Sequence, residues 1–315
     1  MPQYNRTDLD SAARSYGFTR DTFEKVLRLK EILAWIRTQD FLRQHLLLKG
    51  GTAINLTVFE LPRLSVDIDM DFTPNSPRED MLVVRAKINK LIRSYMESEG
   101  YSLLPASRFH HSLDAFHYTY RNAAGNPDMI KIELNYSLRA HIFEPTERIL
   151  TTDAFGGNIS VLTVDPMEIF AAKANALLSR AAARDLYDFN NMINRNLFDG
   201  QSNLFRKCII FYASISQDSI DSTFRTTAID TLTFQKIRRD LFPVLTQEER
   251  HQKFNLDSRK LTTKDYIQSL MIPTATEKEY MDRFGAKEYQ PQLLFDNDSI
   301  LQRLQDHPMA LWKCR

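Results

Sequence analysis

Three aspartates, Asp67, Asp69 and Asp71, alternate with apolar residues in a short segment of the chain. On a β-strand, residues two apart point to the same face, so these carboxylates would share one face while the apolar residues enter a core. Like charges on one strand face repel each other, and a divalent cation bound by carboxylate oxygens relieves the repulsion. The pattern therefore predicts either a metal site or a solvated edge strand with an acidic outer face, and alone it favours neither.

A second motif, Lys49-Gly50-Gly51-Thr52, lies between a predicted strand at 46–48 and a predicted helix at 53–59. Glycines let backbone N–H groups approach a phosphate, and a helix N-terminus adds positive potential. Taken alone, the two glycines are more typical of a tight turn without a ligand. Combined with the acidic strand, they predict a site for a metal-bound triphosphate, in which the turn binds phosphate oxygens and the carboxylates hold the metals.

A third carboxylate is expected because two seldom fix both ions of a two-metal phosphoryl-transfer site. Glu133 is the candidate, since it shares the polar face of a predicted strand at 129–136 with Lys131 and Asn135. An ordinary amphipathic strand explains this segment equally well when it is taken by itself.

A cation is expected on the far side of a bound triphosphate. Lys173 lies along one side of a predicted helical region with Arg180 and Arg184, and Asp185 and Asp188 follow one turn apart. Periodicity alone favours a surface helix with local ion pairs. As a functional site, the segment would be a phosphate clamp in which a nearby carboxylate orients the lysine.

The elements that must position these residues form two groups along the chain. A mixed α/β part is predicted up to about residue 195 and a mostly helical part after it, so we expect an α/β (α+β) fold with domains at 1–195 and 196–315. Strands are predicted over 46–48, 65–72, 115–120, 129–136 and 159–164, the last after a turn at Gly156-Gly157, and helices over 21–41, 53–59, 79–98, 166–180, 183–194, 204–215, 228–241 and 299–306.

Two of the helices have specific start signals. Asp21 followed by Glu24 three residues later predicts a capping box. Asp165 followed by Pro166 predicts an N-cap with proline at the first helical position, and Glu168 lies three residues past that cap.

The overall composition is that of a globular protein. The chain has 315 residues, of which 43% are hydrophobic and 26% charged, and its 41 basic and 40 acidic residues give a net charge of +1. These values exclude a disordered, collagen-like or coiled-coil chain and do not support a generally basic nucleic-acid-coating protein. We expect a cytoplasmic protein with reduced thiols and no membrane span, because no long apolar run, signal peptide or disulfide framework is visible.

In this order, the motifs resemble the AbiEii/AbiGii-type nucleotidyltransferase family, toxins of bacterial toxin–antitoxin and abortive-infection systems within the DNA polymerase β-like superfamily. The resemblance extends over most of the chain. The matching positions are Lys49-Gly50-Gly51-Thr52-Ala53, Arg63, Ser65, Asp67, Asp69, Lys131-Ile132-Glu133, Lys173, Arg184-Asp185-Leu186-Tyr187-Asp188 and the ending His307-Pro308-Met309-Ala310-Leu311-Trp312.

The resemblance implies a mixed-sheet nucleotidyltransferase core, 1–195, followed by a mostly helical C-terminal part, 196–315. It implies Mg²⁺-dependent transfer of a nucleoside monophosphate from an NTP to an RNA acceptor, the tRNA 3′ end, with release of pyrophosphate and a block of translation. It also implies a cognate antitoxin protein as a partner.

Residue roles carry over position by position. The resemblance implies that Asp67 and Asp69 are catalytic metal ligands, with Glu133 as the third ligand. Asp71 matches no required position and is expected to be a solvated neighbour. Lys173 would contact the triphosphate, Asp185 would be the aspartate of the last motif with Asp188 as its rival, and Gly50, Gly51, Thr52 and Ser65 would lie near the phosphates.

Other functions share parts of this pattern. A nucleotidyltransferase that modifies a protein or a small molecule would have the same site, and a non-catalytic interaction protein could retain the scaffold. A glycosyltransferase with an Asp-x-Asp motif predicts neither Gly50-Gly51 nor Lys173. An RNA acceptor would need a confined basic surface, for which the candidate sets, each also explicable as ordinary solvated charges, are Arg206-Lys207, then Lys236 with Arg238 and Arg239, and Arg259-Lys260 with Lys264.

Overall fold

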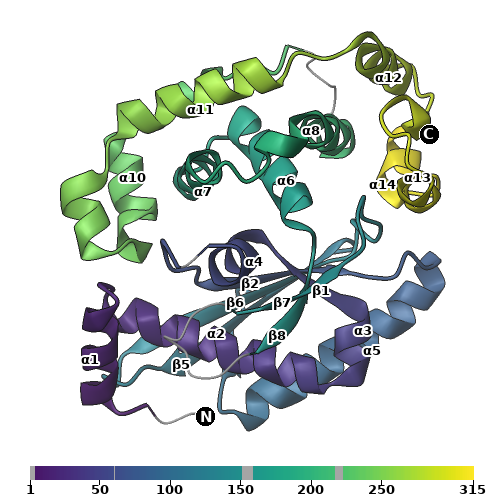
Figure 1. Ribbon diagram of the computed structural model, residues 1–315. Helices are drawn as coiled ribbons and strands as arrows, with labels where there is room; N and C mark the ends of the chain where they lie inside the picture. Colours follow the sequence, from purple (N-terminus) through teal and green to yellow (C-terminus); the bar gives the residue numbers. More distant parts are fainter. Residues whose placement is uncertain (1–3, 60, 151–158, 217–222) are drawn as a thin grey trace. The chain divides into compact units, whose positions relative to one another are not determined.

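The computed structural model describes residues 4–59, 61–150, 159–216 and 223–315, and the chain divides into two compact units (Figure 1). Unit 1 comprises Met1–Arg139, Pro145–Val164 and Val244–His251, and unit 2 comprises Ala140–Glu144, Asp165–Pro243 and Gln252–Arg315. This division differs from the predicted boundary at residue 195, because the helices between 166 and 194 group with the C-terminal helices. The predicted turn at Gly156-Gly157 lies outside the described residues.

The described elements of unit 1 include both helices and strands, whereas those of unit 2 are helical. Unit 1 contains α1 Arg6–Ser15, α2 Arg20–Thr38, α3 Asp40–His45, β1 Leu46–Lys49, α4 Gly50–Thr57, β2 Asp67–Phe72, α5 Arg78–Ser98, β3 Ser102–Leu103, β4 Arg108–Phe109, β5 Leu113–Arg121, β6 Pro127–Asn135, β7 Thr146–Ile149 and β8 Ser160–Thr163. Unit 2 contains α6 Pro166–Ser179, α7 Ala183–Asn194, α8 Ser202–Ser216, α9 Thr227–Asp230, α10 Phe234–Asp240, α11 Leu256–Leu270, α12 Ala275–Gly285, α13 Asp298–Leu304 and α14 Pro308–Lys313.

The strands of unit 1 form one mixed sheet in the order β3-β5-β6-β2-β1-β8-β7, with β4 paired to β5. β2 pairs with β1 antiparallel and with β6 parallel, and β1 pairs with β8 parallel. The predicted mixed α/β fold is therefore confirmed. None of the helices in the described part of the chain combines the length and the hydropathy needed to cross a membrane.

The two faces of the central strands have opposite chemistry. Ile68 and Met70 of β2 are buried, and Leu33 and Ile36 of α2 line the same small cavity as Met70. Because side chains alternate along a strand, the carboxylates of β2 project to the face opposite this apolar packing. Burial of the apolar face fixes the strand register, since a shift by one residue would bury the charges.

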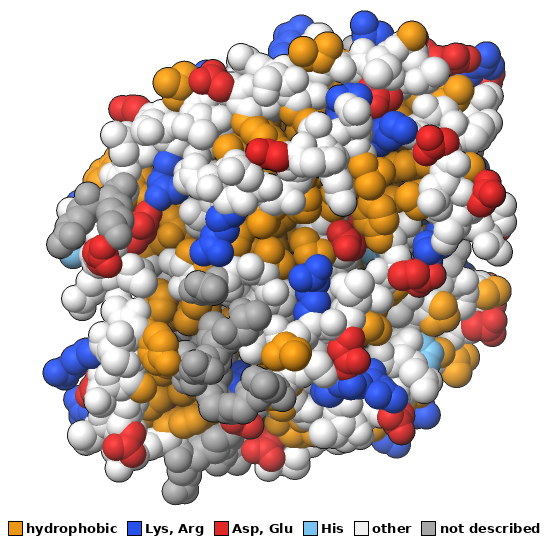
Figure 2. Space-filling model, in the orientation of Figure 1, with side chains coloured by type: hydrophobic (Ala, Val, Ile, Leu, Met, Phe, Trp, Pro, Cys, Tyr) orange, Lys and Arg blue, Asp and Glu red, His pale blue; other side chains and the backbone are white. Residues whose placement is uncertain are grey.

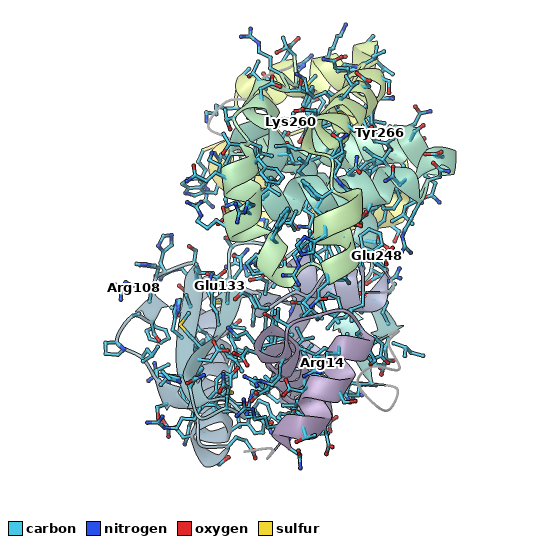
Figure 3. All side chains as sticks on the ribbon, turned by 90° about the vertical axis from the view of Figure 1, so that its left-hand side faces the viewer. Arg14, Arg108, Glu133, Glu248, Lys260 and Tyr266 are labelled. Carbon is cyan, nitrogen blue, oxygen red and sulfur yellow. The ribbon has the colours of Figure 1, made fainter. Side chains whose placement is uncertain are left out.

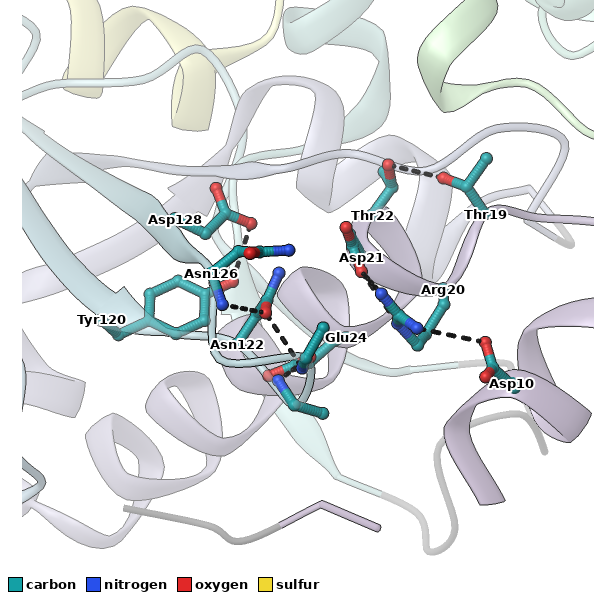
Figure 4. Close-up of polar contacts among 12 residues, drawn as sticks. Asp10, Thr19, Arg20, Asp21, Thr22, Glu24, Tyr120, Asn122, Asn126 and Asp128 are labelled. Atoms are coloured by element: carbon teal, nitrogen blue, oxygen red, sulfur yellow. Dashed lines mark hydrogen bonds and ion pairs between the residues drawn. The ribbon is translucent and has the colours of Figure 1, made fainter. Parts of the chain in front are cut away.

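The start of α2 differs from the predicted capping box. The helix begins at Arg20 with Thr19 as its N-cap residue, and Asp21 pairs with Arg20 instead (Figure 4). Glu24 is fully buried, where it binds Arg28 at 2.7 Å and accepts a hydrogen bond from the Ala123 N–H at 2.8 Å. The carboxylate thus joins α2 to the β5–β6 hairpin instead of capping the helix.

The predicted start of α6 is confirmed, because the Asp165 side chain accepts a hydrogen bond from the Met167 N–H. Glu168 is fully buried, and its hydrogen bonds join α6 to two other segments of unit 2. Its carboxylate accepts hydrogen bonds from the Ile142 N–H at 2.8 Å, the Phe143 N–H at 3.0 Å and the Tyr212 hydroxyl at 2.7 Å.

Replacing Glu168 by glutamine is expected to lower the free energy of unfolding by about 1–2 kcal/mol. One carboxylate oxygen becomes an NH₂ group that faces a donor, so a buried hydrogen bond is lost. Urea denaturation of the full chain measures the change. Glu144→Gln is the matched control, because that side chain is 74% exposed and should lose less than about 0.5 kcal/mol; equal losses in both variants would contradict the role of Glu168.

Candidate active site

A row of charged side chains crosses the centre of the sheet of unit 1. Lys49 of β1 is in register with Asp69 of β2, and Asp69 is in register with Glu133 of β6. Asp67, two residues before Asp69, is in register with Lys131. The sheet therefore brings the three predicted metal ligands onto one face of two neighbouring strands; Glu133 is labelled in Figure 3.

The glycine turn lies against this row. Gly50 has a φ of +70°, a conformation that L-residues with side chains rarely adopt. A Cβ atom added at Gly50 would lie 2.7 Å from Asp69 Oδ2, and one added at Gly51 would lie 2.8 Å from the Arg63 guanidinium and 2.9 Å from Ser65 Oγ. The two glycines are thus needed for the close approach of the turn to Asp69, Arg63 and Ser65.

The hydroxyls of Thr52 and Ser65 hold the turn to the start of β2. Thr52 is fully buried, lies 2.9 Å from Ser65 Oγ and donates to the Asp67 carbonyl. Asn55 donates to the Gly51 carbonyl at 2.9 Å. Thr52 and Ser65 were expected near phosphate. The structure places their hydroxyls in contacts between α4, β2 and the segment that joins them.

Asp71 is not the solvated neighbour that the sequence predicted. It is 2% exposed and forms an ion pair with Lys49. A carboxylate leaves water only with a partner, and Lys49 on the adjacent strand supplies it. The third aspartate therefore orients the lysine that precedes the glycine turn.

Burial, together with neighbouring carboxylates, raises the pKa of Asp69. Burial, followed by repulsion from Glu133 and Asp67, raises the pKa of Asp69 from 3.8 to about 6, while Lys49 and Lys131 oppose the rise. Lys131 also pairs with Glu133 at 2.9 Å. The face therefore carries negative charge that a bound cation would stabilise.

The donor chemistry fits a hard divalent cation, because Asp67, Asp69 and Glu133 supply carboxylate oxygens on adjacent positions of paired strands. Within the described ranges, no three His, Cys, Asp or Glu side chains are arranged to hold a metal ion as they stand. Lys131 engages one oxygen of the third carboxylate, that of Glu133.

A substitution at Gly50 tests the close approach. Gly50→Ala should reduce the nucleotide transfer that the resemblance implies at least about tenfold, and it should cost about 1–2 kcal/mol of stability, because it adds backbone strain and a clash with Asp69. Gly125→Ala is the control, since Gly125 has a φ of +83° but no atom within 4 Å of an added Cβ. The control should show similar strain and normal transfer in a labelled-NTP assay; equal activity of the two variants would contradict the assignment.

In unit 2, Lys173 is held by two carboxylates. Its ammonium lies 2.8 Å from Asp185 Oδ1 and 2.9 Å from Asp188 Oδ2, and all three side chains are nearly buried. Arg180 approaches Asp185 at 3.8 Å from an exposed position. The two aspartates that the sequence left as rivals therefore both orient Lys173, one from each of two successive turns of α7.

Comparison with known proteins matches the sequence to a family. The sequence profile described as "Nucleotidyl transferase AbiEii toxin, Type IV TA system" matches residues 32–274, a range that contains every site residue described above. The chain belongs to the AbiEii nucleotidyltransferase toxin family. No curated protein sequence matches the AbiEii-family chain.

A solved structure has the same fold as this AbiEii-family toxin. MenT4, a nucleotidyltransferase toxin from Mycobacterium tuberculosis H37Rv, aligns with a TM-score of 0.63, covering 98% of this chain and 99% of that chain at 16% sequence identity. At this identity the likeness shows the fold. The predicted nucleotidyltransferase fold is thereby confirmed.

Two residues of the AbiEii-family site have contacts that sequence reasoning did not assign. Lys49 pairs with Asp71 and lies in register with Asp69, and the fully buried Arg63 guanidinium lies against Gly51. The position of Lys49 directly before the glycines was the available signal. Arg63 was among the positions that match the family pattern but was given no role, and nothing in the sequence predicted the β-bridge that it forms with the distant Leu245.

Proposed function

We propose that this AbiEii-family toxin transfers a nucleoside monophosphate from an NTP to an RNA hydroxyl, that of a tRNA 3′ end, and thereby blocks translation. The observation that carries the proposal is the register of Lys49, Asp69 and Glu133 beside a glycine turn that touches Asp69. Carboxylates beside a phosphate-binding turn at a helix start are what transfer of a charged phosphoryl group requires.

In the proposed reaction, the acceptor hydroxyl loses its proton to water as its oxygen forms a bond to the α-phosphorus, and the bond from the α-phosphorus to the oxygen that bridges it to the β-phosphate breaks. Pyrophosphate leaves with the bonding electron pair. Asp67, Asp69 and Glu133 would hold Mg²⁺ in a two-metal site, and the bound metal would lower the pKa of the attacking hydroxyl and offset the charge of the leaving group. The N–H groups of the glycine turn would bind phosphate oxygens.

The remaining residues orient these groups. Thr52 and Ser65 fix the glycine turn against β2, and Asp71 fixes Lys49. Lys173 is proposed as a triphosphate contact, with Asp185 and Asp188 holding its ammonium in place. A cytoplasmic location and a cognate antitoxin protein complete the proposal, since the family consists of toxins of a type IV toxin–antitoxin system.

Incubation of the pure protein with total tRNA, Mg²⁺ and each labelled NTP in turn tests the proposal. We expect label in tRNA with the wild type and none with Asp67→Ala, whose fold is checked by circular dichroism. Labelling by Asp67→Ala at a near-normal rate would refute the metal assignment.

The same assay separates the alternatives. Transfer of label to a protein or a small molecule, but not to tRNA, would change the acceptor while leaving the site intact. Absence of both labelling and NTP binding by calorimetry with Mg²⁺ would indicate a non-catalytic interaction protein.

A further inference from the structure

The three basic sets proposed for RNA binding differ in what their side chains contact. Arg206 is engaged with Glu277 at 2.9 Å, and both side chains are largely buried. Lys264 pairs with Asp230 at 2.9 Å, and Arg259 donates to a side chain of α7 at 2.8 Å. These charges stabilise unit 2, so two of the three sets have contacts inside the protein that explain them.

The third set, on α10, is exposed and accompanies a hollow in the surface. Phe234, Gln235, Arg238 and Arg239 line a shallow hollow of about 520 Å³ that is open to solvent. Lys236, Arg238 and Arg239 are all exposed on this short helix. In the view of Figure 2, Lys and Arg side chains are interspersed with Asp and Glu and form no broad positive field.

An aromatic ring forms one wall of this hollow. Phe234 is 51% exposed, and its ring makes an edge contact with Phe242 at 5.6 Å between centroids. Phe242 is in turn braced by Phe254 at 5.6 Å. The ring of Phe234 is thus supported from within unit 2 while half of its surface faces solvent.

The charges beside this ring are not equivalent. Arg239 is paired with Asp240 through two contacts at 2.6 and 2.8 Å. Among the described residues, no ion pair or hydrogen bond engages the Arg238 guanidinium. Lys236 donates weakly to the Thr231 carbonyl at 3.4 Å. Arg238 is therefore available to an external anion next to an exposed aromatic ring and an amide.

We infer that the α10 hollow binds an unstacked base of single-stranded RNA, with Phe234 stacking on the base and Arg238 contacting an adjacent phosphate. Gln235 supplies both a donor and an acceptor for the edge of the base. An aromatic platform flanked by cations is how proteins bind single strands, whereas an acidic peptide would use the charges and leave the ring without a partner. The inference rests on the proposed function only in naming RNA as the acceptor.

Fluorescence anisotropy with a labelled single-stranded RNA tests the inference on the full chain. Phe234→Ala should weaken binding about fivefold or more without changing the salt dependence, because a stacking contact is lost. Arg238→Gln should reduce the slope of log K against log salt by about 0.7, because one phosphate contact is lost. The matched controls are Trp312→Ala, an aromatic that is 60% exposed and lies beside Lys313, and Lys278→Gln; both should bind as the wild type does.

Reversing Lys236, Arg238 and Arg239 together should weaken RNA binding and leave NTP binding unchanged. RNA affinity equal to that of the wild type in the triple variant and in Phe234→Ala would overturn the inference. Wild-type binding of an RNA duplex or an acidic peptide as tight as that of the single strand would overturn it too. If the α10 variants label tRNA as fast as the wild type does when RNA is limiting, the inference about α10 is overturned. The proposed function would still stand. Wild-type RNA binding with the expected stacking and salt signatures, but no labelling by any NTP, would support the α10 site and refute the proposed function.

Discussion

Asp69→Asn is expected to lower nucleotide transfer about a thousandfold or more while making the folded protein more stable. The carboxylate is central to the charged row, with Glu133 in register on one side and Gly50 touching it on the other. An amide has nearly the same shape but no charge, so the fold is retained while a cation ligand is lost. Above about pH 6, stability should rise by about 1–3 kcal/mol, because the cost of burying the charge and the repulsion from Glu133 and Asp67 are both removed.

The pH dependence of unfolding gives this prediction a definite sign. Because the pKa of Asp69 is raised from 3.8 to about 6, the folded protein binds this proton more tightly than the unfolded chain does. The contribution of Asp69 to stability is therefore lost as the pH rises from about 4 to 6. Urea denaturation of the two proteins should show a difference that grows across this window and is constant above it.

The control for Asp69→Asn is Asp128→Asn, an acidic residue at the far end of β6 from Glu133. It should retain transfer. Normal nucleotide transfer by Asp69→Asn would rule out the proposed role of Asp69. A lower stability of Asp69→Asn than of the wild type above pH 6 would contradict the raised pKa.

Lys173→Met is expected to destabilise the protein by about 3–5 kcal/mol as well as abolish transfer. The substitution removes the ammonium that binds both Asp185 and Asp188, and leaves two nearly buried carboxylates without it. Removing one partner from a buried ionic group is costly because the remaining charge is poorly solvated. Urea denaturation measures the loss.

Two further variants distinguish this explanation from a general packing defect. Arg180→Met removes a contact at 3.8 Å from a side chain that is 74% exposed, and should change stability by less than about 0.5 kcal/mol. Combining Lys173→Met with Asp185→Asn and Asp188→Asn should recover most of the lost stability without restoring transfer. A combined variant as unstable as Lys173→Met alone would show that the buried charges are not the cause.

Local sequence patterns were sufficient to predict the strands that carry the site. The alternation of Asp67, Ile68 and Asp69 predicted a strand with one polar face, and β2 is that strand. The cap at Asp165 was also visible, because an N-cap uses contacts within one turn. Period and capping are properties of neighbouring residues, so a sequence displays them directly.

Local sequence patterns gave wrong predictions where a side chain binds a partner that is distant in the sequence. The predicted capping box at Asp21 and Glu24 is absent because Glu24 binds Arg28 and the N–H of Ala123, which lies in the distant β5–β6 hairpin. Asp71 was expected in solvent because nothing in β2 reveals the lysine on the neighbouring strand. In both cases burial of a charge became favourable through a partner that only folding supplies.

The sequence by itself determined the chemistry of this AbiEii-family toxin: which carboxylates share a strand face, where the backbone can turn tightly, and which lysine has acidic residues within reach. The tertiary structure decided the pairing of β2 with β1 and β6, which places Lys49, Asp69 and Glu133 in one row, and it decided which basic residues are engaged and which stay exposed on α10. The physical reason is that alternation is set by bond geometry along the chain, whereas register and ion pairing depend on which distant surfaces are buried together.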